Sequence, residues 1–373
     1  MKTKLFFFVS VVLLVSCHGV HDATGEAVGE VCRTEYATCF EITHGDGYTL
    51  AEVRDPWDTT RTLHRYVLVD RSAPLPEALP DGTLVRTPLE RVAVYSSVHC
   101  GMLDELRLGD RVAAVCESRY IDLPFVREGL SRGTIVDLGE ASSPDVERLI
   151  EVGPEAVIVS PLENSGYGRV EKTGIPIIEC VDYMEDSPLG RTEWVRFMAL
   201  FFGRESLADS LFGVTVSAYD SLCRLVSETT ERPTVLTERK YGASWYVPGG
   251  RSYTARLLRD AGADPIWNEN ADRGSVPLPF EAVFDRARSA RFWLIKYNAP
   301  QPMTYDALRS EYEAYGRFSA FENRHIFVCN TAEVPYYEEL PLHPDRVLGD
   351  LIRIFHPDLL PDRRLRYYNR MER

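Results

Sequence analysis

The sequence predicts two α/β lobes with parallel sheets, joined by one long helix and preceded by a short β-rich extension. Three observations carry this prediction. Short apolar runs alternate with segments of helical spacing in both halves of the chain, as they do in parallel α/β layers. Between the halves, residues 192–230 carry apolar residues at three- and four-residue steps and only two glycines, which indicates a long helix. Finally, one helix-then-strand unit occurs twice.

The repeated unit reads SPDVERLIEVGPEAVIV at residues 143–159 and LPFEAVFDRARSARFWLI at residues 278–295. Each copy has a proline near the helix start, a glutamate in the first turn (Glu147 and Glu281) and then an apolar run. A carboxylate in the first turn is favoured by the helix dipole. Capping alone would account for either glutamate, but the shared position favours two related lobes.

Residues 1–16 predict a signal peptide. The basic segment MKTK precedes an apolar run over residues 5–15, which is too short to span a membrane as a helix. The letters LVSC at residues 14–17 resemble the bacterial lipobox, in which the cysteine is lipidated and becomes the mature N-terminus. Plain secretion with a chance cysteine is the alternative. We therefore expect a periplasmic bacterial lipoprotein, anchored in the membrane through lipid chains on Cys17.

The remaining elements follow in order. Residues 17–87 are expected to hold a tether and the β-rich extension, with antiparallel strands over 38–70 and a proline-bearing connector over 74–88. The N-terminal lobe is expected over 88–191, with strands near 92–95, 112–116, 156–159 and 176–181. The linking segment over 192–230 reads as one helix, or as two with a break near Gly203. The C-terminal lobe is expected over 231–373, with strands near 234–237, 292–295 and 325–329.

Charge and cysteine usage exclude some functions. The formal charge of −14 over 373 residues argues against a nucleic-acid partner, which would need clustered basic residues. The cysteines lack the paired spacing of a zinc site. In an oxidising compartment Cys32 and Cys39 are candidates for a local disulfide. No catalytic group, metal site or cofactor is predicted.

The loops after the expected strands predict a ligand site. In parallel α/β lobes, ligands bind beyond the carboxyl ends of strands. These loops are rich in aromatic and hydrogen-bonding side chains, which suit stacking on a sizeable organic ligand. The candidate ligand-binding residues are Ser97, His99, Tyr120, Glu163, Tyr167, Tyr183, Arg239, Tyr241, Trp245, Tyr246, Lys296 and Tyr297.

Catalytic motifs are absent from the sequence. No serine lies in a G-x-S-x-G elbow, residues 247–253 lack the P-loop pattern, and there is no H-E-x-x-H. The VPGGRSY stretch at 247–253 leads into a helix and could present amides to an anion. His343 and His356, each next to a proline, are expected at turns or helix ends.

Several pieces together resemble the substrate-binding proteins of ABC importers, in the group that captures ferric siderophores, haem and cobalamin. They are RVAVY at 91–95, LDELRLGDRVAAV at 103–115, SPDVE with its following strand, GRE at 203–205 and LLRDAGA at 257–263. The resemblance covers roughly residues 88–360. It implies that Glu147 and Glu281 dock onto arginines of a permease dimer, and that the ligand is a metal chelate.

The resemblance ranks ferric siderophore first, cobalamin or another corrinoid second, and haem third. A carboxylate siderophore would need cations, for which the candidates are Arg169, Arg239, Lys240, Arg251 and Lys296. Cobalamin could be held by aromatic stacking with few charges. Two other classes stay open: a metal chelatase-like surface enzyme using His99 or His343, and a lipoprotein that only binds partner proteins.

Overall fold

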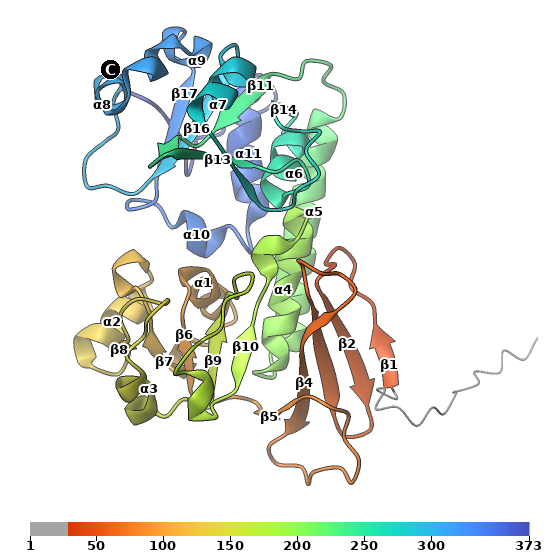
Figure 1. The fold of residues 1–373 in the computed structure, drawn as a ribbon. Coiled ribbons are helices and arrows are strands. Elements are labelled where there is room, and N and C mark those ends of the chain that lie inside the picture. Colours follow the sequence, from red (N-terminus) through yellow and green to blue (C-terminus); the bar gives the residue numbers. More distant parts are fainter. Residues whose placement is uncertain (1–28, 373) are drawn as a thin grey trace, which may run out of the picture.

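The computed structural model describes residues 29–372, which form two lobes and a flanking β-sheet (Figure 1). The predicted signal peptide and the predicted lipidation site Cys17 lie outside the described residues. Within the described residues, no helix is long and apolar enough to cross a membrane.

Sheet A forms the β-rich extension, in the order β1-β2-β3-β4-β5. The predicted antiparallel strands are present, but the segment expected to be a connector contains a further strand, β5, which pairs in parallel with β4. Cys32 is exposed and Cys39 is buried, and both are free thiols, so the proposed disulfide between them is wrong. The strands are β1 (Gly29–Cys32), β2 (Phe40–Gly45), β3 (Thr49–Arg54), β4 (Thr62–Asp70) and β5 (Thr83–Thr87).

The N-terminal lobe is built on sheet B, whose five parallel strands have the order β10-β9-β6-β7-β8. Central strands β6, β7 and β9 are buried throughout, as expected of a parallel sheet covered on both faces. The strands are β6 (Val92–Val94), β7 (Val112–Val115), β8 (Val136–Asp137), β9 (Ala156–Val159) and β10 (Ile177–Glu179). The helices are α1 (Ser97–Glu105), η1 (Gly109–Arg111), η2 (Ser118–Tyr120), α2 (Pro124–Arg132), α3 (Val146–Val152), η3 (Glu171–Thr173) and η4 (Asp182–Met184).

Two helices, α4 (Pro188–Leu200) and α5 (Glu205–Val226), make the link. The break falls at Gly203, whose φ of +63° is a left-handed conformation that glycine adopts without steric cost. The long helix that joins the lobes is therefore α5, and α4 lies beside it (Figure 1). Helix α4 is almost wholly buried.

The C-terminal lobe is built on sheet C, in the order β14-β11-β16-β17-β18, and is parallel apart from β18. A small antiparallel sheet D, β12-β13-β15, flanks it. As predicted, His343 and His356 are the end residues of α11. The strands are β11 (Thr234–Thr237), β12 (Lys240–Tyr241), β13 (Ser244–Pro248), β14 (Asp264–Pro265), β15 (Ser275–Leu278), β16 (Phe292–Tyr297), β17 (Ile326–Asn330) and β18 (Asn369–Arg370). The helices are α6 (Tyr253–Asp260), α7 (Phe280–Ala287), α8 (Tyr305–Glu311), η5 (Glu313–Arg317), α9 (Ser319–Glu322), α10 (Tyr336–Glu339) and α11 (Pro344–Phe355).

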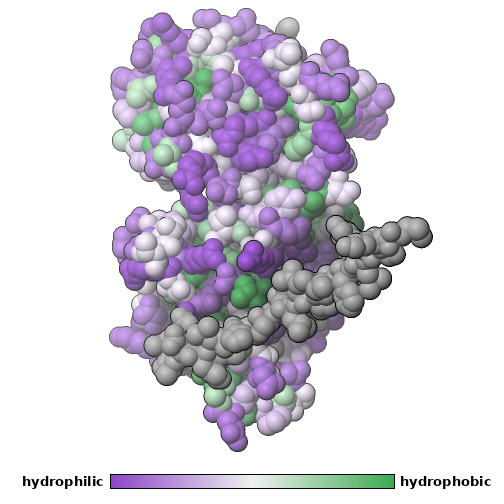
Figure 2. Space-filling model, turned by 90° about the vertical axis from the view of Figure 1, so that its right-hand side faces the viewer, coloured by the Kyte–Doolittle hydropathy of each residue, from purple (hydrophilic) through white to green (hydrophobic). Residues whose placement is uncertain are grey.

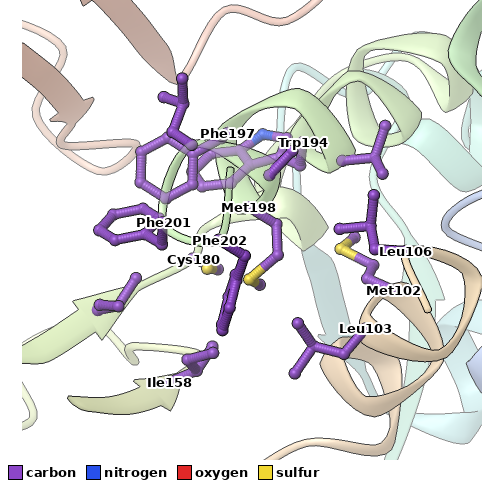
Figure 3. Close-up of a cluster of buried hydrophobic side chains, with 14 of the residues drawn as sticks. Met102, Leu103, Leu106, Ile158, Cys180, Trp194, Phe197, Met198, Phe201 and Phe202 are labelled. Atoms are coloured by element: carbon purple, nitrogen blue, oxygen red, sulfur yellow. The ribbon is translucent and has the colours of Figure 1, made fainter. Parts of the chain in front are cut away.

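One apolar core joins sheet A, helix α4 and sheet B. Phe40 of sheet A meets Trp194 of α4 edge-on at 5.0 Å between ring centroids, and Tyr66 meets Phe201 at 5.5 Å. Figure 3 shows α4 and the residues just after it next to Ile158 of sheet B. Because the same buried helix packs against both sheets, the apolar side chains of sheet A belong to the core of the N-terminal lobe.

Two buried glutamates bind the segment between β1 and β2 of sheet A. The carboxylate of Glu193 accepts hydrogen bonds from the backbone N–H groups of residues 35, 36 and 37, each at 2.8 Å. The carboxylate of Glu185 accepts from those of Thr38 (2.8 Å) and Cys39 (3.0 Å), and from Trp194 Nε1 (2.9 Å). Five consecutive backbone donors are thus satisfied by two side chains, which offsets the cost of burying these carboxylates.

Candidate functional site

The carboxyl ends of strands from both lobes line a cleft. Ser97 follows β6 and Tyr120 follows β7 in the N-terminal lobe, while Lys296 ends β16 in the C-terminal lobe, and all three line one cavity of about 580 Å³. This is the edge at which parallel α/β sheets bind ligands, and the volume lies within the range of small-molecule sites. Figure 2 shows the waist between the lobes from one side, on a mostly hydrophilic surface.

This first cavity brings together seven of the predicted ligand-binding residues. They come from separate elements of both lobes, so only the tertiary structure places them side by side. Four of the seven are tyrosines, which combine an aromatic face with a hydroxyl group. The seven are Ser97, Tyr120, Arg239, Tyr241, Tyr246, Lys296 and Tyr297.

Two cations of the first cavity, Lys296 and Arg239, are paired with carboxylates. Lys296 of β16 pairs with Glu238, which directly follows the neighbouring strand β11. Burial disfavours the charged form of Lys296, but the Glu238 carboxylate and nearby tyrosine hydroxyls outweigh it, and the pKa of Lys296 is raised well above its usual value. Arg239 Nη1 lies 2.5 Å from Glu311 Oε1. Lys296 is therefore charged at neutral pH.

A second cavity of about 900 Å³ continues the first, because Pro248, Tyr253, Thr254 and Ser275 line both. It contains the predicted residues Glu163 and Tyr183.

Two arginines of the second cavity, Arg251 and Arg273, face the carboxylate of Asp186, with N···O distances of 4.0 and 3.6 Å. Arg251, Ser252, Tyr253 and Thr254 at the start of α6 line this cavity. The stretch at 247–253 therefore contributes residues to the lining of the cleft.

Sheet A supplies one wall of the second cavity, which the sequence did not predict. Pro56 and Trp57, from the loop after β3, lie among the lining residues. The loop is shaped by Asp55, whose Oδ1 accepts hydrogen bonds from the N–H groups of Trp57 (2.9 Å) and Asp58 (3.0 Å). No local pattern pointed to this role, since it depends on how sheet A docks against the lobe.

Three predicted ligand-binding residues lie outside both cavities, and for each the reason is packing. His99 is fully buried, with Nε2 3.2 Å from Asp182 Oδ1. Trp245 is fully buried because side chains alternate along β13, so that Tyr246 faces outward and Trp245 inward. The hydroxyl of Tyr167 donates to Glu179 at 2.7 Å.

Of the cations expected in the cleft, Arg169 also lies elsewhere, since its Nη2 is 3.1 Å from Glu147 Oε1. Glu147 is largely exposed in the first turn of α3. Glu281 is exposed in the first turn of α7. The two glutamates therefore occupy matching places on the two lobes, and neither lines the cleft cavities.

Among residues 29–372, no group of three or more His, Cys, Asp or Glu side chains could hold a metal ion. His343 is engaged with Glu105, with Nε2 and Oε1 2.8 Å apart. The cleft offers hydroxyl groups, cations and aromatic faces, an arrangement that recognises an organic ligand by stacking and hydrogen bonding.

Residues 92–332 match the model of a family described as periplasmic binding protein. The chain belongs to this family. It is thus a solute-binding, non-enzymatic component of transport. The matched range contains sheet B, the parallel strands of sheet C and the linking helices.

The binding protein also resembles archaeal lipoproteins. It is 25% identical to an uncharacterized lipoprotein of Methanocaldococcus jannaschii over 327 residues, covering 82% of this chain and 76% of the relative. A second uncharacterized lipoprotein of that organism is 22% identical over 325 residues, covering 83% and 80%. These likenesses extend beyond the family's matched range.

Solved structures share the fold. A molybdate-binding protein of Haemophilus influenzae superposes with a TM-score of 0.60 at 14% identity, covering 75% of this chain and 90% of that one. A protein of an Fe3+-hydroxamate transport system from Saccharomonospora viridis gives 0.55 at 18% identity, covering 72% and 94%. A Helicobacter pylori protein with bound Ni(II) gives 0.59 at 13% identity, covering 75% and 88%.

Proposed function

We propose that this binding protein captures a metal chelate outside the cytoplasm, with a ferric siderophore as the first candidate, and delivers it to the permease of an ABC importer. The observation that carries the proposal is the cleft itself. Two adjoining cavities of about 580 and 900 Å³ take side chains from both lobes, which is room for an organic molecule of several rings.

The lining favours an intact chelate over a bare metal ion. A bare ion needs several carboxylate, imidazole or thiolate ligands converging on one point, and residues 29–372 hold no such group. Tyrosines line the first cavity and Trp57 the second. Such side chains stack on and hydrogen-bond to the organic shell of a chelate.

The charges in the cleft favour a siderophore among the chelates. Arg239, Lys240 and Lys296 line the first cavity, while Arg251 and Arg273 line the second. All of these cations except Lys240 already face a carboxylate. Anionic groups of a ferric complex would receive charge-assisted hydrogen bonds from them in competition with these acids. Cobalamin or another corrinoid, held by stacking on the same tyrosines, is the second candidate, and haem is the third.

The other classes of function fit the site less well. A chelatase-like surface enzyme would use His99 or His343, but His99 is buried against Asp182 and His343 is paired with Glu105. A lipoprotein that only binds partner proteins would have no need of an aromatic cleft between its lobes.

Delivery in this proposal uses Glu147 and Glu281. Two exposed acids on related lobes are suited to engage a permease dimer, where charged pairs fix orientation more than they add affinity. Glu147 would exchange its exposed partner Arg169 for an arginine of the permease. Lipid chains on Cys17 would keep the protein at the membrane surface.

The test is calorimetry with ferric hydroxamate and carboxylate siderophores, their metal-free forms, cobalamin and haem. We expect micromolar or tighter binding of at least one ferric complex, and weaker binding to a Tyr241→Ala/Tyr246→Ala variant. Val214→Ala, on an exposed position of α5, is the control and should bind as the parent does. If no chelate binds, the protein acts on another solute or only on proteins.

A further inference from the structure

A separate basic depression lies on the C-terminal lobe, at the opposite edge of sheet C from the cleft. Its walls come from the starts of β16 and β17, the end of α11 and the C-terminal segment, and its volume is about 530 Å³. The cleft, in contrast, takes Lys296 and Tyr297 from the carboxyl end of β16. One strand therefore contributes to two separate sites, one at each end.

The floor of the depression is apolar and its rim is cationic. Phe292, Phe327, Phe355 and Leu365 are among the apolar residues. Arg291, Arg353, Arg363 and Arg370 also line it, and no aspartate or glutamate does. In a chain of formal charge −14, four arginines around one depression are an exception to the general charge distribution.

Two of the four guanidinium groups, those of Arg353 and Arg370, are oriented without being neutralised. Arg353 Nη1 donates to the carbonyl oxygen of Pro357 at 2.5 Å, and Arg370 donates through Nε and Nη2 to that of Arg324 at 3.1 and 3.0 Å. A carbonyl group fixes the direction of the side chain but leaves its positive charge uncompensated.

The other two arginines have acidic neighbours. Arg291 pairs with the exposed Glu231, while Arg363 Nε lies 3.5 Å from buried Asp350. Burial, with the charge of Arg370 adding to it, lowers the pKa of His325 in the same depression.

We propose that this depression binds a single-chain amphipathic anion, with its carboxylate or phosphate head between Arg353 and Arg370 and its tail on the phenylalanines. A guanidinium is suited to either head group, and about 25 cal/mol per Å² of apolar surface favours burial of the tail. The volume is sufficient for a chain of moderate length. This site does not rest on the function proposed for the cleft.

The test is calorimetry with decanoate and decyl phosphate on the full chain. Decanol, decyltrimethylammonium, acetate and inorganic phosphate separate the contributions of head and tail. We expect saturable, one-to-one binding of at least one decyl anion, and no binding of the other four at the same concentration. The comparison of decanoate with decyl phosphate shows whether the site prefers a carboxylate or a phosphate head group.

Variants locate the site. Arg353→Gln/Arg370→Gln should weaken binding of the anion about tenfold or more, through the loss of two charge-assisted hydrogen bonds. Arg127→Gln/Arg132→Gln, at two exposed positions of α2 in the other lobe, is the matched loss of two charges and should change nothing. Tyr246→Ala in the cleft should also leave decanoate binding unchanged.

Three results would overturn the proposal. They are equal binding of the cationic and anionic amphiphiles, unchanged affinity in the double variant, and loss of binding in the Tyr246→Ala cleft variant. Binding to anionic phospholipid vesicles without binding of any monomeric decyl anion would also overturn it, because the arginines would then attract a surface and hold no ligand. Unfolding temperatures of the variants verify that each is folded, and the single variants Arg353→Gln and Arg370→Gln serve if the double one is not.

Discussion

The guanidinium group of Arg191 lies over the ring of Tyr253, 4.7 Å from the ring centroid. Arg191 belongs to α4 in the link and Tyr253 begins α6 of the C-terminal lobe. On its other side, Arg191 Nε donates to Asp182 Oδ2 at 2.9 Å, at the end of the N-terminal lobe's sheet. Since Tyr253 lines both cleft cavities, this chain of contacts connects the ligand site to the junction of the lobes.

Replacing Arg191 by methionine should therefore destabilise the protein. Asp182 is buried, and the variant would leave its carboxylate with His99 as the remaining partner. Removing one member of a buried ion pair typically costs about 3–5 kcal/mol. Urea denaturation measures the free energy of unfolding. The exposed Arg224→Met on α5 is the control, and a loss no larger than that control would refute the assigned role of Arg191.

Acid should weaken a contact between the lobes. Glu105 at the end of α1 pairs with His343 before α11, and the His343 hydrogen bond is the main cause that lowers the pKa of Glu105 below its usual 4.5. A carboxyl group whose pKa is lowered by folding stabilises the protein at pH values above its unfolded-state pKa. This stability is lost as the pH falls through the folded-state pKa.

Glu105→Gln should thus reduce the free energy of unfolding at pH 7 by less than about 1 kcal/mol, since the pair is partly exposed. The difference from the parent protein should disappear as the pH falls below about 4. Thermal unfolding followed between pH 3 and pH 7 measures this. A difference that persists unchanged at pH 3 would show that the charge of Glu105 is not its cause.

One amide substitution should weaken the binding of residues 35–39 by the carboxylates of Glu185 and Glu193. In Glu193→Gln, the side-chain NH2 replaces one of the two oxygens that accept the three backbone N–H groups. Leaving buried donors unsatisfied costs about 1–3 kcal/mol each, so we expect a loss of about 2–4 kcal/mol in unfolding free energy. Limited proteolysis should release sheet A sooner than in Glu205→Gln, an exposed control on α5.

Trp57 should affect ligand binding from a position outside the two lobes' own loops. Trp57→Ala removes the aromatic wall that sheet A gives to the second cavity. An aromatic contact is worth about 0.5–1.5 kcal/mol beyond its area, so affinity for the chelate found by calorimetry should fall about tenfold. Trp57→Phe should retain most of it. Equal affinities of the alanine variant and the parent would remove Trp57 from the site.

Charge reversal tests the delivery step of the proposed function. Glu147→Lys/Glu281→Lys should abolish uptake in cells while ligand affinity stays within about twofold, because neither side chain lines the cleft. Glu151→Lys, on another exposed acid of α3, should leave uptake unchanged. If ligand binding is lost together with uptake, these glutamates serve the fold or the cleft instead.

Local sequence patterns determined most of the α/β elements. The two repeated units became α3 with β9 and α7 with β16, because hydrophobic periodicity and helix-start signals act over a few neighbouring residues. The same logic found Ser97 and Lys296, since residues at or just after the ends of parallel strands gather at one sheet edge. It also made the family recognisable, because its motifs keep their order along the chain.

Only the tertiary structure decided which side chains reach the cleft. Trp245 and Tyr246 are adjacent in sequence, and the alternation of β13 sends one into the core and the other to solvent. Trp57 became part of the cleft because Glu185 and Glu193, more than a hundred residues away, bind the segment between β1 and β2 of its sheet. Such contacts depend on long-range docking of preformed units, which no local pattern of residues encodes.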